Sequence, residues 1–403
     1  MTRTLKNTSE AFIILLIGLV QFIDILDFMM VMPLGPDFSK DLNFNITKMG
    51  YLSGIYALAA AISGLVFSSV LDKFDRKPLL CFSLVGLAFS TAAGGFACSE
   101  ATLLASRFFA GAFGGPATAA AFAIVADVVE PSRRGAAMGK VWGSFSIASV
   151  VGVPFGLELA RVTSWRMPFY TVSMMAIITA ILIYYKLPSI RGHIDDNKNK
   201  VKVTYFSLLS HKNYLVSYLS VALATMAAFM IIPYISPQLQ VNLHLPREQI
   251  STQYFVGGVL SFLAMRITGR MIDKYNATVT TAIGTLIIGA TLFGGFIFPQ
   301  MTSYIPIVVV FAPFMVGMSI RNVSSSANSS KVPSSFDRAG FMSLSSCFSH
   351  LFSALGALFS SYILYKTKDG LIANMEYIGS ISMILFVLTI PLVYIIEKSL
   401  HKK

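Results

Sequence analysis

Two aspartates and one arginine lie inside apolar stretches, where a charged side chain needs a specific reason to be present. Asp24 and Asp27 interrupt the run 11–33, and Arg107 interrupts the run 101–128. The aspartates are three residues apart, so a helix presents them on one face. A charge in hydrocarbon costs several kcal/mol unless it is paired, hydrated or neutralised. These residues are therefore the first candidates for chemistry, and the chemistry they offer is binding and release of a proton.

Asp27 and Arg107 are predicted at the same depth in the membrane. Asp27 lies six residues before Pro33, at the outer end of its run, and Arg107 lies six residues after the start of its own run. At about 1.5 Å per residue, each is roughly 9 Å inside. Apolar surroundings favour the neutral acid and a nearby arginine favours the anion. We therefore expect Asp27 or Asp24, with Asp27 favoured, to carry a proton beside Arg107. A static ion pair between two helices is the alternative.

Apolar runs of bilayer length dominate the chain. Hydrophobic residues make up 55% of its 403 residues and charged residues only 12%, whereas soluble domains carry about 25% charge. About 20 apolar residues cross a bilayer as a helix, and the alternation of a membrane barrel is absent. The sequence predicts an all-α integral membrane protein with twelve transmembrane helices, at 11–33, 46–71, 79–98, 101–128, 136–161, 166–187, 213–236, 250–271, 277–298, 303–327, 340–365 and 370–396.

The net charge of +12 indicates membrane sidedness rather than nucleic acid. Of the 31 lysines and arginines, 21 lie in loops or span ends on one side of this topology and 7 on the other. Cytoplasmic loops carry the positive excess, so both termini are predicted in the cytoplasm and the protein in the inner (plasma) membrane. The three cysteines are isolated in apolar runs, without metal or redox spacing, so no metal site is expected.

The chain divides into two halves that resemble each other. The longest polar segment between spans, 188–212, is a predicted cytoplasmic linker between six spans in 1–187 and six in 213–403. The loops after the second and eighth spans share a hydrophobic residue followed by aspartate and lysine. The loops after the fourth and tenth spans share Pro-Ser followed by arginine, glycine and methionine. Such repeats are typical of secondary transporters, whose substrate site lies between the halves near the midplane.

At these residues the chain resembles the major facilitator superfamily over essentially its whole length. Asp72, Arg76 and Lys77 match the family's charged loop signature, although serine and aspartate replace two of its usual glycines. The fourth span, from Arg107 onward, resembles the arginine-glycine motif. The string Gly152-x-Pro154-x-Gly156 resembles the glycine-proline motif of the twelve-helix drug:proton antiporters and the related sugar-efflux-like permeases.

The resemblance implies two six-helix halves around a central cavity that the first and fourth helices line. It also implies residues that control the conformational cycle, by locking loops or by letting helix five bend. A topology anchor and simple helix packing are the alternative roles. These gating candidates are Asp72, Arg76, Lys77, Asp273, Gly152, Pro154 and Gly156.

Four further polar residues are candidates for the substrate cavity: Gln21, Tyr234, Arg321 and Asn322. Arg321 opens a polar stretch in the tenth span, the second-half counterpart of the fourth. It either lines the cavity with Asn322 and favours an anionic or oxygen-rich substrate, or it extends towards the cytoplasmic surface.

These observations predict a secondary active transporter that works by alternating access as a monomer and exchanges an inward proton for an outgoing small molecule. The chain has no Gly-x-x-x-x-Gly-Lys-[Ser/Thr] loop and no catalytic motif, so neither a cofactor nor an enzyme activity is expected. Proton-coupled import of an organic anion, such as a carboxylate or a siderophore, is the alternative. Three arginines within spans motivate it: Arg107, Arg266 and Arg321.

Overall fold

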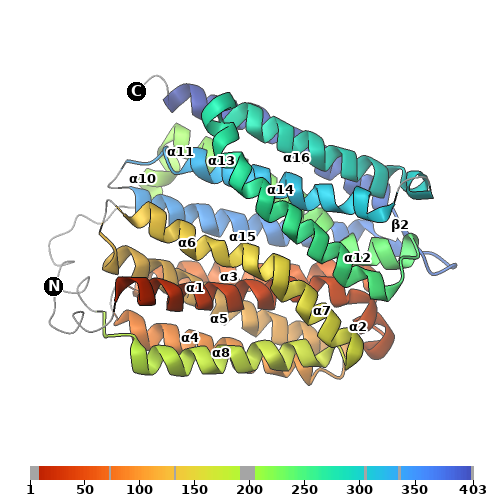
Figure 1. Cartoon of the computed structure of the whole chain (residues 1–403), viewed down its shortest axis with the longest axis horizontal. Coiled ribbons are helices and arrows are strands. Elements are labelled where there is room, and N and C mark those ends of the chain that lie inside the picture. The colour runs from red at the N-terminus through yellow and green to blue at the C-terminus, as the bar shows by residue number, and fades with distance from the viewer. Residues whose placement is uncertain are drawn as a thin grey trace. The chain divides into compact units, whose positions relative to one another are not determined.

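The computed structural model describes residues 9–71, 74–130, 133–190, 205–303, 306–334 and 337–400. Helices make up almost all of these residues (Figure 1). Strand structure in the described part of the chain is limited to an antiparallel pair, β1 (Tyr365–Lys366) and β2 (Ile372–Ala373). The predicted all-α membrane class is therefore correct.

Ten helical stretches of the described residues are long and apolar enough to cross a membrane. One of them, Arg247–Ile297, has 51 residues and contains the eighth predicted span and all but the last residue of the ninth. A further helix of 23 residues, α14 (Ile307–Ser329), coincides with the tenth predicted span. The described helices follow the order of the predicted spans, although ten stretches rather than twelve meet the length and hydropathy requirements.

The chain forms two compact units, and the first lies within residues 1–31 and 55–202. In it, α4 packs against α5 and α8, and α1 packs against α5 and α6 (Figure 1). This packing places the aspartates of α1 next to the helix that carries Arg107. The helices of this unit are α1 (Glu10–Met30), most of α3 (Met49–Leu71), α4 (Arg76–Gly95), α5 (Glu100–Val128), α6 (Arg134–Ile147), α7 (Val153–Val162) and α8 (Arg166–Lys186).

Polar residues fix the starts of two helices in the first unit. Ser99 and Thr102 form a reciprocal capping box at the start of α5. The Asp75 carboxylate accepts from the backbone N–H groups of Lys77 and Ile190, both at 3.1 Å. The capping box and the Lys77 contact satisfy donors that a helix start would otherwise leave without a partner. Asp75 thereby also joins the start of α4 to the segment that follows α8.

Small residues on α5 let α3 approach very closely. A Cβ atom at Gly111 would lie 2.1 Å from the Tyr56 carbonyl oxygen, and one at Gly115 would lie 2.5 Å from the Ala60 carbonyl oxygen. Neither distance tolerates a side chain, so glycine is required at both positions for this packing. Close contact through small residues is characteristic of helix packing in membranes. It brings Tyr56 directly over the polar part of α5.

The predicted fifth span is interrupted near its middle. Helix α6 continues into a π-helical turn, η4 (Ala148–Gly152), and then into α7, which begins with Pro154 at one of its first two positions. Proline cannot donate to the preceding turn, and the wider π turn accommodates this loss. A Cβ atom at Gly152 would lie 2.9 Å from Leu26 Cδ1. The glycine therefore allows the interrupted helix to pack tightly on α1.

The second unit lies within residues 32–54 and 203–403. It therefore includes a segment that precedes most of the first unit in the sequence. Its helices are η2 (Met32–Leu34), α2 (Gly35–Leu42), η3 (Ile46–Lys48), the start of α3, α10 (Tyr205–Ser210), α11 (Lys212–Ile231), η6 (Ile232–Tyr234), α12 (Ile235–Pro237), η7 (Gln238–Asn242), α13 (Arg247–Leu292), η8 (Phe293–Ile297), η9 (Pro299–Ser303), α14, α15 (Arg338–Ile363) and α16 (Met375–Leu400).

Side-chain contacts hold residues 32–54 within this unit. The Arg247 guanidinium forms an ion pair with Asp37 at 3.1 Å. The Ser236 hydroxyl donates to the Pro33 carbonyl oxygen at 2.8 Å. The boundaries predicted from the sequence instead assign this segment to the first half, because the loop after the first span precedes the linker in the chain.

Helix α13 contains a break at Asn276, whose φ of 75° and ψ of 171° are not helical. Two consecutive helices therefore meet at this residue. At the start of the second helix, the backbone N–H groups of Ala277 and Thr278 donate hydrogen bonds to the Glu397 carboxylate, at 3.0 Å and 3.2 Å. A carboxylate is favourable at a helix N-terminus because the exposed N–H groups carry partial positive charge. This contact joins the end of α16 to the second part of α13.

Candidate functional site

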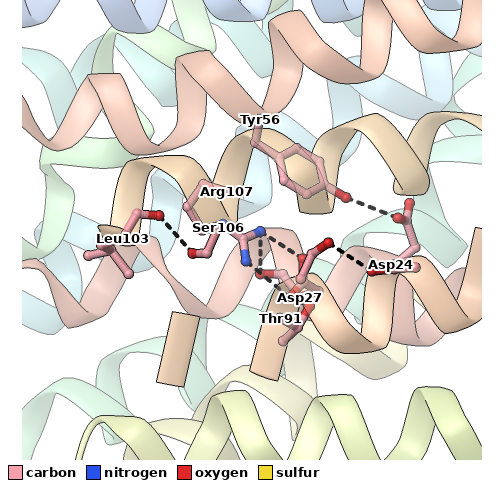
Figure 2. A network of polar contacts seen from close by, with 9 residues as sticks. Asp24, Asp27, Tyr56, Thr91, Leu103, Ser106 and Arg107 are labelled. Atoms are coloured by element: carbon pink, nitrogen blue, oxygen red, sulfur yellow. Dashed lines mark hydrogen bonds and ion pairs between the residues drawn. The ribbon is translucent and has the colours of Figure 1, made fainter. Parts of the chain in front are cut away.

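Asp27 of α1 and Arg107 of α5 form an ion pair (Figure 2). Arg107 Nη2 lies 2.7 Å from Asp27 Oδ2 and Nη1 lies 3.1 Å from Oδ1, so the contact is bidentate. The Thr91 hydroxyl, from α4, donates to Oδ1 at 2.7 Å. The exposed fraction is 0% for Asp27 and 1% for Arg107. The residues predicted at equal depth therefore lie in direct contact, in a fully buried pair.

Asp24 has a different environment on the same helix. Its Oδ1 accepts from the Tyr56 hydroxyl at 3.0 Å and its Oδ2 from the Thr118 hydroxyl at 2.9 Å. The amide of Gln21 donates to Thr118 at 3.3 Å, which adds a third polar residue to the group. Asp24 is only partly buried, and none of the ion pairs among the described residues includes it. One carboxylate is therefore paired with a cation, and its neighbour is held by hydroxyl groups.

Tyr56 of α3 contacts both Asp24 and Arg107, the ion-pair partner of Asp27. Its hydroxyl bonds to Asp24, and its ring lies 4.9 Å from the guanidinium carbon of Arg107 (Figure 2). A cation over an aromatic ring gains about 0.5–2 kcal/mol, depending on hydration. The ring also packs against Phe28, with centroids 4.8 Å apart. A change in the charge of Asp24 would therefore alter the hydrogen bond of Tyr56, whose ring covers Arg107.

Gly114 provides the space for this arrangement. A Cβ atom at this position would lie 2.5 Å from the Tyr56 hydroxyl oxygen and 2.6 Å from Asp24 Oδ1. Arg107, Gly111, Gly114 and Thr118 follow the spacing 4-3-4, so they form one stripe along α5. The arginine, the glycines that admit Tyr56 and the threonine that holds Asp24 thus share one helix face.

Sequence analysis did not identify Tyr56, Thr91 or Thr118. Threonine and tyrosine are ordinary residues in membrane helices, and a single sequence does not distinguish these from the others. Only Thr118 had a usable signal, because its distance of eleven residues from Arg107 places it on the same helix face.

In the second unit, Arg321 is buried, with an exposed fraction of 4%. Its Nη2 donates to the Thr389 hydroxyl at 2.6 Å, and its Nη1 donates to the Thr285 hydroxyl. The guanidinium carbon lies 4.7 Å from the centroid of the Phe386 ring. Asn322 is exposed, so adjacent residues of α14 face different surroundings. Arg321 therefore neither shares a surface with Asn322 nor extends towards the helix end.

Tyr234, a predicted substrate contact, is fully buried and already engaged. Its hydroxyl donates to the Thr47 carbonyl oxygen at 2.8 Å and accepts from the Gly50 N–H at 3.1 Å. It also lies 2.6 Å from the Ser361 hydroxyl oxygen. These contacts join the break after α11 to the segment 32–54 and to α15, so the hydroxyl holds this packing together.

Four of the predicted gating candidates are charged residues. Asp72 lies outside the described residues. Arg76 forms an ion pair with Asp127 at 3.2 Å, joining the start of α4 to the end of α5. The Lys77 ammonium lies 5.5 Å from the centroid of the Tyr184 ring. Asp273, in the second-half copy of the loop, is exposed.

The glycine-proline motif lies on the interrupted fifth span. Gly152 ends the π turn against Leu26 of α1, and Pro154 follows at the start of α7. A Cβ atom at Gly156 would approach only Pro168 Cβ, at 4.0 Å. Gly152 is therefore required by close packing, whereas Gly156 has room for a methyl group.

A model of the Major Facilitator Superfamily matches residues 17–359. The chain belongs to the major facilitator superfamily. The family resemblance inferred from the sequence motifs is thereby confirmed. Members of this superfamily are transporters, so the protein is a multi-pass membrane transporter and not an enzyme.

Two relatives show how similar this chain is to other members of the superfamily. The MFS-type transporter YceJ of Bacillus subtilis is 26% identical over 282 residues, which span 70% of this chain and 72% of the relative. A chloramphenicol resistance protein of Streptomyces lividans is 23% identical over 259 residues, which span 64% of this chain and 66% of the relative.

Solved structures of superfamily members share the fold. A bacterial homologue of the human lysosomal transporter Spinster, inward-facing and unoccupied, has a TM-score of 0.69 at 15% identity, covering 97% of this chain and 98% of that one. A mutant of the nucleoside transporter NupG has a TM-score of 0.74 at 14% identity, covering 95% and 99%. At these identities the likeness concerns the fold alone.

Proposed function

We propose that this superfamily member is a proton-coupled exporter of a small molecule. It works by alternating access as a monomer, in the inner (plasma) membrane, with both termini in the cytoplasm. The 21-to-7 distribution of lysine and arginine supports the orientation. The proposal keeps the predicted halves 1–187 and 213–403, joined by the linker 188–212; transporters built from such repeats bind substrate near the membrane midplane.

The observation that carries the proposal is the difference between the surroundings of two neighbouring carboxylates, Asp27 and Asp24. Asp27 is fully buried and bound in two places by Arg107, so protonating it would leave a guanidinium without its anion. Asp24 is partly exposed and held by two hydroxyls. Protonation of Asp24 breaks no ion pair. We therefore assign the moving proton to Asp24 and a fixed electrostatic role to Asp27 and Arg107, although the sequence had favoured Asp27.

The contacts of Asp24 offer a route from proton to conformation. As an anion it accepts from both Tyr56 and Thr118; as a neutral acid it must donate through one of its oxygens. One hydroxyl then has to rotate, which changes the link of α1 to α3 or to α5. Gln21 donates to Thr118, so a rotation of the Thr118 hydroxyl would also affect this candidate substrate contact. Proton binding thus alters how three helices of one unit are held together.

The ion pair of Arg76 and Asp127 is the candidate cytoplasmic lock. It joins α4 and α5 at the ends that the predicted topology places in the cytoplasm. Lys77, beside Tyr184, and Asp72 belong to the same loop in the proposal, with Asp273 as the second-half counterpart. We expect this group to set the rate of the conformational cycle rather than the choice of substrate.

Two observations support export as the direction. The interrupted fifth span carries Gly152-x-Pro154-x-Gly156, which resembles the glycine-proline motif of exporters. One relative, at 23% identity, is named a chloramphenicol resistance protein.

Import of an organic anion, such as a carboxylate or a siderophore, is the second candidate, and one observation favours it. Arg321 is a buried cation whose partners are hydroxyl groups. An anionic substrate would supply the missing negative charge.

The test is transport by the purified protein in proteoliposomes with an imposed pH gradient. The probes are labelled chloramphenicol, a cationic dye, a sugar and citrate, and proton movement is followed with a trapped pH-sensitive dye. Export by exchange predicts movement of at least one probe opposite to the proton, with reversal when the gradient is reversed. Movement of citrate together with the proton would establish the importer instead, and transport indifferent to the gradient would contradict both.

Matched carboxamide variants identify the proton site. Asp24→Asn should abolish gradient-driven transport while leaving exchange of probe for probe across equal pH. Glu158→Gln changes a carboxylate that is paired with Arg161 at the exposed end of α7, so it should transport like the wild type. Gradient-driven transport by Asp24→Asn at the wild-type rate would refute the assignment.

A further inference from the structure

The guanidinium of Arg321 lies in a part of the chain that offers no carboxylate. The segments that surround it, 277–330 and 377–396, contain neither aspartate nor glutamate. The ion pairs of the described residues likewise do not include Arg321. An unpaired charge removed from water is expensive, and buried charges are normally paired. The described residues therefore give the guanidinium two hydroxyl partners but no counter-charge.

The two hydroxyl partners are oriented to receive the guanidinium. Thr285 donates its own proton to the Thr281 carbonyl oxygen at 2.8 Å, and Thr389 donates to the Phe386 carbonyl oxygen at 2.6 Å. Each hydroxyl therefore turns a lone pair towards Arg321. Helices α13 and α16 thus hold the cation in place through neutral groups that an anion can displace.

An apolar groove lies directly beside this cation. It has a volume of about 420 Å³ and runs between the second part of α13 and α16. Thr285 and Phe386, which contact the guanidinium, also line the groove, together with Leu286, Gly289, Met383 and Val387. Leu286 is 77% exposed and Val387 is 47% exposed, so the groove opens on an apolar face that membrane lipid would cover. One layer of side chains separates hydrocarbon from the charge.

We propose that this groove binds a long-chain carboxylate from the bilayer, with the chain along the groove and the carboxylate on Arg321. A carboxylate matches a guanidinium in two parallel hydrogen bonds and would replace the Thr285 hydroxyl as partner. Because a carboxylate is much smaller than a phospholipid headgroup, it needs less displacement of side chains to reach Arg321. Arg321 lies eight residues before the end of α14, about 12 Å along the helix, whereas headgroups stay outside a hydrocarbon core about 30 Å thick. The inference holds for either direction of transport.

The experiment is binding of labelled palmitate to the full-length protein in nanodiscs of phosphatidylcholine. The wild type should bind saturably, and Arg321→Gln should bind at least tenfold more weakly. Arg321→Lys, which keeps the charge but not the fork, should fall between them. Arg266→Gln is the matched control, because this exposed arginine stacks on Phe262 in the first part of α13. It should bind like the wild type. Equal affinity of wild type and Arg321→Gln would overturn the proposal.

A second variant tests the groove with Arg321 intact. A Cβ atom at Gly289 meets only Met383 Cε, at 3.7 Å, so Gly289→Leu can fill the groove without moving the backbone. It should weaken palmitate binding at least tenfold, and unchanged binding would show that the chain lies elsewhere.

Competitors test the ligand class. Hexadecanol has the same chain without the charge and should compete at least tenfold less well than unlabelled palmitate. Competition by hexadecanol equal to that by palmitate would overturn the role of the carboxylate. Competition by phosphatidylglycerol equal to that by palmitate would assign the site to a lipid headgroup and overturn the committed ligand.

Discussion

Arg107 and Arg321 occupy corresponding spans of the two halves, and both are buried, yet their surroundings differ in one respect. Arg107 is held by a carboxylate, a second contact to the Asp27 backbone and the Tyr56 ring. Arg321 is held by two threonines and the Phe386 ring. In the first site the charge of Arg107 is neutralised by Asp27. In the second, the charge of Arg321 has no counter-charge among the described residues. The same residue type thus stabilises one unit internally and leaves the other dependent on an outside anion.

Removing the anion of the first site should have the largest effect. Asp27→Asn keeps the shape but leaves Arg107 buried without its counter-charge, which should lower the free energy of unfolding by about 3–5 kcal/mol. Unfolding in detergent, followed by thermal or denaturant titration, measures it. The double variant Asp27→Asn with Arg107→Gln should recover part of the loss. A single variant as stable as the wild type would mean that the pair is dispensable.

Truncating the two arginines to an apolar side chain compares the sites directly. Arg107→Met should destabilise by about 3–5 kcal/mol, because it leaves the Asp27 anion unpaired, whereas Arg321→Met should be neutral or stabilise by up to about 4 kcal/mol. The same unfolding titrations in ligand-free detergent measure both. Equal destabilisation by the two changes would contradict the difference drawn between them.

The hydroxyl of Thr91 contributes a hydrogen bond to a charged acceptor. Thr91→Val removes it from Asp27 at nearly constant volume, and the expected loss is about 1.5–3 kcal/mol. Thr179→Val is a suitable comparison, since Thr179 is also buried but outside the ion-pair cluster. A loss no larger than that of the comparison would show that Arg107 alone satisfies Asp27.

A methyl group at Gly114 should disturb Asp24 without touching the ion pair. Gly114→Ala forces Tyr56 or Asp24 to move and should lower the free energy of unfolding by about 1–3 kcal/mol. Gradient-driven transport should fall by more than this loss of stability alone would cause. Gly156→Ala places its methyl group in ordinary contact with Pro168 and should change neither property by a measurable amount. If the two variants transport alike, the Tyr56 contact has no part in coupling.

The sequence predicted the class of fold because apolar runs of bilayer length indicate transmembrane helices. It predicted the pairing of Asp27 with Arg107 because the position of each residue along its run gives its depth. It could not rank Asp24 against Asp27, since their difference lies in Tyr56 and Thr118, which come from two other helices. The surroundings of Arg321 could not be predicted either, because its partners Thr285 and Thr389 lie 36 and 68 residues away. The enclosed position of Tyr234 depends on segment 32–54, whose packing no local pattern indicates.

The membership of residues 32–54 in the second unit has a consequence for recombination between related genes. A chimera joined at the linker would take this segment from one parent and its contacts from the other. Asp37 would then meet whatever residue the second parent places at Arg247, and the Pro33 carbonyl would need a donor equivalent to Ser236. Compatibility between parents therefore depends on the loop after the first span, and a functional exchange must transfer two separate pieces of coding sequence together.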